Sequence, residues 1–248
     1  MENLNNQSPG PLSEEQWYLK FDIIKILEPI NCENDKLNIM RELIFSNPCF
    51  DKEQRILFLS TYRSATLPKR NGLRMLVAIA DQQKHRGKNE RAQKLDEIKL
   101  ILRVDLFNLC NEVHQMIDKY LLPKASDQES QAFYYVMKAD FFRYMHEFAN
   151  SADQIEYEHK AQEFYQKASE ISLQKDSSLS LAISLNYSVF LYEVQKQKKK
   201  AIEVAQQALD ESGILVNDGN DENFSESITM QGLIRENISA WTRDEADT

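Results

Sequence analysis

The chain has 248 residues, 42% of them hydrophobic, which is enough to bury a substantial core in one large domain or two small ones. Its formal net charge of −9 at pH 7 argues against nucleic acid or an anionic membrane as the main partner, because both bind basic surfaces. The Asn-rich N-terminus lacks the apolar segment of a signal peptide, and no stretch approaches the ~20 apolar residues of a membrane span. The three cysteines have neither disulfide-framework nor metal-ligand spacing. We therefore expect a soluble cytoplasmic or nuclear protein with no cofactor and no metal.

The pattern of helix starts and stops predicts an all-α protein. Only six Gly and six Pro punctuate the chain, and no alternating β-branched runs lie between turn signals. Capping residues, prolines and glycines divide it into about nine antiparallel helices. We expect them at 13–28, 34–46, 52–83, 88–122, from 126 through the segment around 143, and at 153–173, 177–194, 199–211 and 225–243.

The expected organisation is a single all-helical domain over 13–243. Residues 1–12 are expected to form a flexible N-terminal tail, 244–248 a short C-terminal tail, and the polar, acidic stretch 217–223 a flexible loop. A tetratricopeptide array would repeat every ~34 residues, and the sequence has no such period. Stacked antiparallel hairpins would nevertheless be similar to such an array.

One arginine lies inside the otherwise apolar segment 133–145, which carries Tyr, Phe, Met and Ala at helical spacing. We expect this helix to be mostly buried. Asp140 precedes Arg143 by three residues, so on a helix its carboxylate can hold the guanidinium in one orientation. The two residues form either a structural ion pair beside packed aromatic rings or the start of an anion site.

Three arginines of the third helix share one face. Arg63, Arg70 and Arg74 are separated by seven and then four residues, which places them in one narrow stripe at about 100° per residue. Such a stripe is either a solvated surface or a basic site. Pro68 and Gly72 are expected to interrupt the helix that carries it.

Two later helices place an amide in apolar surroundings. Asn186 shares a helix face with Val189 and Glu193, at i+3 and i+7. In the last helix Asn237 belongs to a stripe of residues four apart that ends at Trp241. A buried amide must form hydrogen bonds, so each is either a core Asn bonded to nearby backbone or a contact for a ligand.

Four segments, taken in order, resemble the 14-3-3 family. They are Tyr62-Arg63 with Lys69-Arg70 and Arg74, then Asp140-Phe141-Phe142-Arg143-Tyr144, then residues 185–193 (LNYSVFLYE), then residues 230–242 (MQGLIRENISAWT). The similarity extends from about Phe50 to Thr242. It implies a concave, cup-shaped helical bundle with a peptide groove. It also implies a non-enzymatic adaptor for signalling regulation that binds phosphoserine or phosphothreonine motifs of client proteins.

The resemblance implies roles for individual residues. Arg63, Arg70, Arg143 and Tyr144 match the family's phosphate ligands, although the family usually has lysine where Arg63 stands. Asp140 would orient the guanidinium of Arg143. The other implied contacts are the amides Asn186 and Asn237 for the peptide backbone, the groove-wall residues Leu185, Val189, Leu233 and Ile234, and Glu193 and Trp241 for ligand side chains.

The chemistry of these residues agrees with the implied ligand, because planar guanidinium forks and a phenol suit a phosphate dianion better than a lysine point charge does. The chain also departs from the family pattern. Val136 stands where the family has a lysine on the groove floor, and Thr229 where an apolar wall residue is usual. The N-terminal region, where the family makes dimer contacts, is less similar, with Ile98 near a usual tyrosine. A homodimer or heterodimer is still expected.

Three other functions remain open from the residues. A tetratricopeptide-like scaffold would bind peptides without any dependence on phosphate. A degenerate family member would have a groove filled by its own tail or by nothing. An enzyme has the least support, because the four histidines accompany no nucleophile motif and no phosphate-binding Gly loop is present.

Overall fold

The computed structural model describes residues 12–30, 32–171, 173–213 and 222–246. Within these ranges it contains nine α-helices and no β-strand, which confirms the all-α prediction. The helices form two compact units, one through Ala125 and one from Ser126 onward. The single domain expected over 13–243 stays a prediction. None of the described helices is long and apolar enough to cross a membrane.

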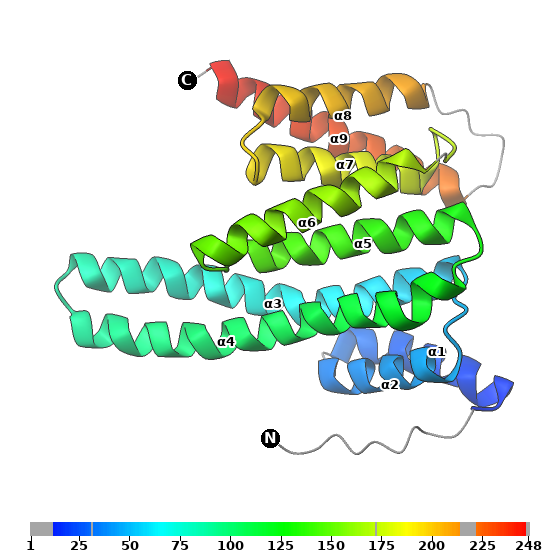
Figure 1. Cartoon of the computed structure of the whole chain (residues 1–248), viewed down its shortest axis with the longest axis horizontal. Helices are drawn as coiled ribbons and strands as arrows, with labels where there is room; N and C mark the ends of the chain where they lie inside the picture. Colours follow the sequence, from blue (N-terminus) through cyan, green and yellow to red (C-terminus); the bar gives the residue numbers. More distant parts are fainter. Residues whose placement is uncertain (1–11, 31, 172, 214–221, 247–248) are drawn as a thin grey trace. The chain divides into compact units, whose positions relative to one another are not determined.

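The first unit is built from two helical hairpins. Figure 1 shows α3 and α4 running side by side, and these two helices make the most extensive contact in the unit. Gly87, with a φ of 71°, lies in the turn between them, where glycine adopts the left-handed conformation at little cost. The elements of the first unit are α1 (Glu14–Leu27), a 3₁₀ turn (Glu28–Ile30), α2 (Glu33–Ser46), α3 (Lys52–His85), α4 (Asn89–Met116), a π-helical turn (Ile117–Leu121) and a 3₁₀ turn (Leu122–Lys124).

Local capping signals explain where two of these helices begin. The side chain of Ser13 accepts a hydrogen bond from the backbone N–H of Gln16, and the Gln16 side chain accepts one from the N–H of Ser13. Asp51 and Gln54 form the same reciprocal pair at the start of α3. Each pair satisfies two backbone donors that a helix start would otherwise leave unbonded.

The expected interruption of the third helix is wrong, because α3 runs without a break through Pro68 and Gly72. Pro68 is exposed, so its ring projects toward solvent, and it removes only the backbone bond to the residue four positions earlier. Tyr62 and Leu73, on either side, are both 0% exposed and anchor the helix in the core. A Cβ on Gly72 would lie 3.1 Å from Leu102 Cδ2, so α4 approaches closely there.

A row of aromatic rings joins α1 to the start of α3. The Trp17 ring lies edge-on to Phe21, with centroids 4.6 Å apart, and Phe21 lies edge-on to Phe50 at 5.5 Å. Phe50 and Phe58 continue the row at 6.5 Å. All four side chains are buried, so this row forms one end of the unit's core.

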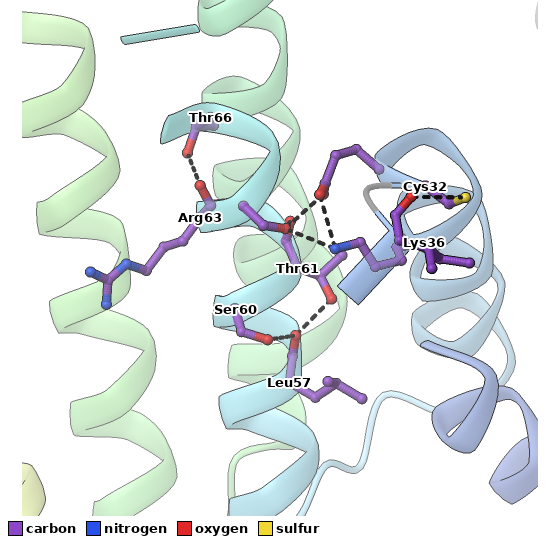
Figure 2. Close-up of polar contacts among 10 residues, drawn as sticks. Cys32, Lys36, Leu57, Ser60, Thr61, Arg63 and Thr66 are labelled. Carbon is purple, nitrogen blue, oxygen red and sulfur yellow. Dashed lines mark hydrogen bonds and ion pairs between the residues drawn. The ribbon is translucent and has the colours of Figure 1, made fainter. Parts of the chain in front are cut away.

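Two polar networks are buried in the same unit. Glu112 on α4 accepts from Arg41 Nη2 at 2.9 Å and from the Tyr62 hydroxyl at 2.9 Å. Lys36, 1% exposed, lies 3.0 Å from Glu33 and reaches α3 by a further hydrogen bond (Figure 2). Both networks join helices through charged groups that are satisfied by partners.

The second unit consists of five helices. Its α5 is almost entirely buried, as predicted for the segment around Arg143. Most of the loop expected at 217–223, the tail expected at 1–12 except Leu12, and residues 247–248 lie outside the described residues. The last helix extends through Ala246. The helices are α5 (Gln128–His146), α6 (Ser151–Glu170), α7 (Ser178–Glu193), α8 (Lys198–Ser212) and α9 (Glu222–Ala246).

Stacked rings and a buried cation hold α5 against α6, which lie side by side in Figure 1. The rings of Phe142 and Phe164 are nearly parallel, with centroids 5.8 Å apart. Lys138 is 5% exposed and its Nζ lies 3.9 Å from the centroid of Phe164. The positive charge of a desolvated lysine is stabilised by the negative face of the aromatic ring. The helix that carries Arg143 is therefore held firmly along its length.

Candidate functional site

Arg143 lies in the last turn of α5 with 15% of its side chain exposed. Its Nη2 donates to Asp140 Oδ1 at 3.2 Å, and its Nε donates to the Tyr165 hydroxyl on α6, also at 3.2 Å. The expected pairing of Asp140 with Arg143 is therefore present. Because both partners are buried, the guanidinium is held in one orientation.

Asp140 is the centre of this arrangement. In addition to Arg143, its Oδ1 accepts from the Tyr165 hydroxyl at 2.5 Å, and its Oδ2 accepts from Asn186 Nδ2 on α7 at 3.1 Å. One carboxylate thus links three helices and joins two of the residues that the sequence predicts as ligand contacts. A buried carboxylate with three donors is well satisfied.

Sequence reasoning missed Tyr165. It lies 25 positions after Asp140, on another helix, in a stripe with Ala161 and Ala168 that has the spacing of an ordinary core face. The only signal was that a tyrosine buried among apolar residues needs a partner for its hydroxyl. Nothing in the local pattern indicates that the partner is Asp140.

Burial and charge set the ionisation of this cluster. Burial, reinforced by the negative charge of Asp140, raises the pKa of Tyr165 well above its ordinary value, so the phenol stays protonated. Burial alone would lower the pKa of Arg143, but Tyr165, Asp140 and Tyr144 together raise it well above its ordinary value. The site therefore holds a neutral phenol and a permanent cation.

The Nη1 edge of Arg143 lies near one exposed carboxylate. Glu193, at the end of α7 with 62% of its side chain exposed, lies with Oε2 3.9 Å from Arg143 Nη1. Tyr144 is 4% exposed, and the centroid of its ring lies 5.4 Å from Arg143 Cζ. Val136, where the sequence lacks a cation, is also buried. An anion that approached this edge would compete with the exposed Glu193 carboxylate for Nη1.

The remaining candidates of the second unit lie on α7 and α9. Leu185, Val189 and Asn237 are half-buried, and Leu233 is 41% exposed. Each of these four side chains is therefore partly accessible to a ligand.

Two others are less accessible. Ile234 is 0% exposed and lies in the core of the unit. Trp241 is 7% exposed, and its indole stacks on Tyr192 with centroids 4.6 Å apart. The ligand roles of both residues stay predictions.

Arg63, Arg70 and Arg74 lie on α3 in the first unit. Arg63 and Arg74 are exposed and Arg70 is half-buried, as a stripe on one helix face requires. Figure 2 shows the Arg63 side chain extending from α3 on the side away from Lys36. The structure thus places the candidate phosphate ligands in two sets, one in each unit.

Comparison with known proteins agrees with the geometry. A family model described as "14-3-3 protein" matches residues 23–242, and the chain belongs to the 14-3-3 family. It is 30% identical to "14-3-3-like protein 2" of Caenorhabditis elegans over 90% of each chain. It is 30% identical to "14-3-3 protein zeta" of Bombyx mori over 89% of this chain and 90% of the relative. It is 28% identical to "14-3-3-like protein C" of Glycine max over 90% of this chain and 87% of the relative.

Membership in this family implies a phosphopeptide-binding adaptor without enzymatic activity. It also implies phosphorylated client proteins and the formation of dimers. The tetratricopeptide-like scaffold, which would bind peptides without phosphate, is not favoured.

Proposed function

We propose that this protein binds phosphoserine and phosphothreonine motifs of client proteins in a basic groove and acts as an adaptor in signalling. The observation that carries the proposal is the fixed orientation of Arg143, whose Nε and Nη2 are bonded to Tyr165 and Asp140. A guanidinium held in this way loses little entropy when an anion binds to its other edge. The proposed location is cytoplasmic or nuclear.

A phosphate dianion has three acceptor oxygens. We propose Arg143 and Tyr144 on α5 as donors to them, and Arg63 and Arg70 on α3 in the roles that the family resemblance implies. Each charge-assisted hydrogen bond contributes about 1.5–3 kcal/mol. Two guanidinium forks therefore suffice to separate a phosphorylated peptide from its unmodified form by a factor of ~100 or more.

The peptide backbone would lie beside the phosphate. Asn186 and Arg143 are bonded to the two oxygens of the same Asp140 carboxylate, which holds the amide near the guanidinium. Asn237 would hold the main chain on the other side of the phosphorylated residue. The apolar wall would consist of Leu185, Val189, Leu233 and Ile234, and ligand side chains would contact Glu193 and Trp241.

A peptide-binding comparison tests the function. A phosphoserine-peptide library would be captured by the wild type, by Arg143→Ala and by Arg91→Ala, the last at an exposed arginine of α4. The wild type and Arg91→Ala should recover phosphopeptides and reject their serine counterparts, whereas Arg143→Ala should recover few. Equal recovery by the wild type and Arg143→Ala would remove the proposed site.

We also propose that the first unit carries a dimer interface, with another copy of this chain or with a related chain as the partner. Large apolar side chains are exposed along the α3–α4 hairpin, including Met75 at 64%, Ile98 at 52% and Ile101 at 66%. Ile98 and Ile101 are three positions apart on α4 and therefore share one helix face, and exposed apolar faces can be protein interaction surfaces. Sedimentation should show a dimer that Ile98→Glu combined with Ile101→Glu dissociates; a monomeric wild type at micromolar concentration would contradict homodimerisation.

A further inference from the structure

Tyr165 is a fully buried tyrosine whose hydroxyl lies between the two charged groups of the site. Its hydroxyl donates to Asp140 Oδ1 at 2.5 Å and accepts from Arg143 Nε at 3.2 Å. A phenol hydroxyl has one donor and can accept at its lone pairs, so both of these bonds are satisfied at once. Because the phenol remains protonated, the same pattern persists throughout the physiological pH range.

The two bonds to Arg143 occupy one edge of the guanidinium. Nε and Nη2 form the side edge of the planar fork, and these are the atoms bonded to Tyr165 and Asp140. The end edge, formed by Nη1 and the second N–H of Nη2, is bonded to neither of these partners, and its Nη1 lies 3.9 Å from the exposed Glu193 Oε2, which an incoming phosphate would have to displace. An end edge binds two oxygens of a carboxylate or phosphate by parallel hydrogen bonds.

Asp140 alone would fix the guanidinium less well. A single bond from Nη2 leaves rotation about the terminal torsions of the arginine, and a second bond from Nε removes most of it. Tyr165 itself has little freedom, since its ring stacks on Tyr187 at 5.6 Å and packs against Phe190 at 5.3 Å. The orientation of Arg143 therefore depends on a residue that touches no ligand.

We propose that Tyr165 is a positioning residue for phosphate recognition, whose hydroxyl fixes the side edge of Arg143 so that the end edge is directed at the phosphate. This inference rests on the proposed function. Removing the hydroxyl leaves the Nε–H of Arg143 without its acceptor and lets the fork turn. The phosphopeptide would then have to order the arginine on binding, at a cost that we expect to weaken its affinity about tenfold.

The test uses two tyrosines of the same stack. Tyr165→Phe keeps the ring and removes only the hydroxyl. Tyr187→Phe is the matched control, because its ring belongs to the same stack and its hydroxyl is bonded to Gln166 rather than to Arg143. Affinities for a phosphoserine peptide and for the serine version would be measured by calorimetry in the full chain. Tyr165→Phe should weaken only the phosphopeptide, and Tyr187→Phe should weaken neither.

Two further measurements separate positioning from a general structural role. In an Arg143→Ala background, Tyr165→Phe should have no additional effect on residual peptide binding, since the group that it positions is absent. In spectra without ligand, the Nε–H proton of Arg143 should show a nuclear Overhauser effect to the Tyr165 ring. That proton signal should broaden in Tyr165→Phe and stay unchanged in Tyr187→Phe.

The outcomes are distinct. If Tyr165→Phe binds the phosphopeptide as tightly as the wild type while the serine peptide is still rejected, the role of Tyr165 is overturned and the proposed function stands. If the wild type binds both peptides equally, the proposed function fails and this inference fails with it. If Tyr165→Phe does not fold, the spectrum of the wild-type protein still tests the proposal. The absence of an Overhauser effect between Arg143 and Tyr165 in that spectrum would overturn the positioning role of Tyr165.

Discussion

Asp140 on α5 and Asn186 on α7 are 46 positions apart in the chain, and their side chains meet at 3.1 Å. Because Asp140 also holds Arg143, a single carboxylate sets the distance between the cation proposed to bind phosphate and the amide proposed to bind the peptide backbone. A change at Asp140 should therefore disturb both contacts together.

Asp140→Asn should weaken phosphopeptide binding by about 10- to 100-fold. The neutral amide pairs less strongly with Arg143 and presents one acceptor oxygen where three donors now converge. Calorimetric titration of wild type and variant measures the effect. The control is Asp210→Asn on the exposed surface of α8, where the carboxylate bonds only to Gln206 among the described contacts. Equal affinities of Asp140→Asn and Asp210→Asn would contradict the prediction.

Phosphopeptide affinity should fall as the pH decreases from 7 to 5. The phosphate loses its second negative charge near its pKa of about 6, whereas the raised pKa values of Arg143 and Tyr165 keep both protein groups in one state. The expected loss is several-fold. A difluoromethylene phosphonate analogue, whose second ionisation occurs at lower pH, should hold its affinity further into the acid range. Identical pH profiles for the two ligands would show that a protein group titrates instead.

Glu112→Ala should lower the free energy of unfolding by about 2 kcal/mol, because it removes the charged acceptor that Arg41 and the fully buried Tyr62 share and leaves them only Asn38 Oδ1 and Met116 Sδ among the described contacts. Urea-induced unfolding would give the value. Glu53→Ala is the matched control: Glu53 pairs with Lys25, but 73% of its side chain is exposed. That variant should change the free energy of unfolding by less than about 0.5 kcal/mol. Similar losses in the two variants would refute the importance of burial here.

Pro68→Ala should stabilise the protein by about 1–2 kcal/mol. Alanine restores a backbone N–H in the interior of α3, and the gain exceeds the entropy that proline removes from the unfolded chain. Pro123→Ala is the comparison, since Pro123 lies at the start of a 3₁₀ turn, where a missing N–H costs little. Thermal unfolding should show a higher midpoint for Pro68→Ala only. A lower midpoint would mean that the proline shapes α3 for packing.

The stability of the protein should decrease as the pH falls below about 6.5, in part because of His146. Burial lowers the pKa of His146, although Glu158 and Glu147 oppose that effect and Lys196 adds to it. The unfolded chain therefore binds the proton first, and stability is lost as the pH falls from the unfolded pKa through the folded one. His146→Gln should reduce the difference in unfolding free energy between pH 7 and pH 5. A pKa of His146 above 6.5, measured by NMR in the folded protein, would reverse the sign.

The sequence was most informative where the signal is local. The caps at Ser13 and Asp51 depend on residues three positions apart, and α1 and α3 begin within one residue of the starts expected at 13 and 52. The break predicted at Pro68 does not occur, because the free-energy cost of proline inside the helix is small compared with the gain from burying Tyr62 and Leu73. That gain cannot be judged from the local sequence.

In the candidate site, too, the contacts within one helix could be predicted and those between helices could not. Asp140 and Arg143 pair across one helical turn, so their contact could be predicted from spacing alone. Tyr165 could not, because its bond to Asp140 depends on how α5 packs on α6. The roles assigned to Arg63 and Arg70 rest on the family resemblance, since an arginine stripe alone is typical of a solvated helix face.

The positions of the two tryptophans allow the two units to be observed separately. Trp17 and Trp241 are the only tryptophans in the chain, and each is buried against aromatic rings of a different unit. Indole fluorescence depends on such surroundings, so Trp17→Phe and Trp241→Phe would each leave one emitter that reports one unit. Coincident denaturation curves from the two variants would show that the whole chain unfolds as one cooperative body, and separate curves would show two.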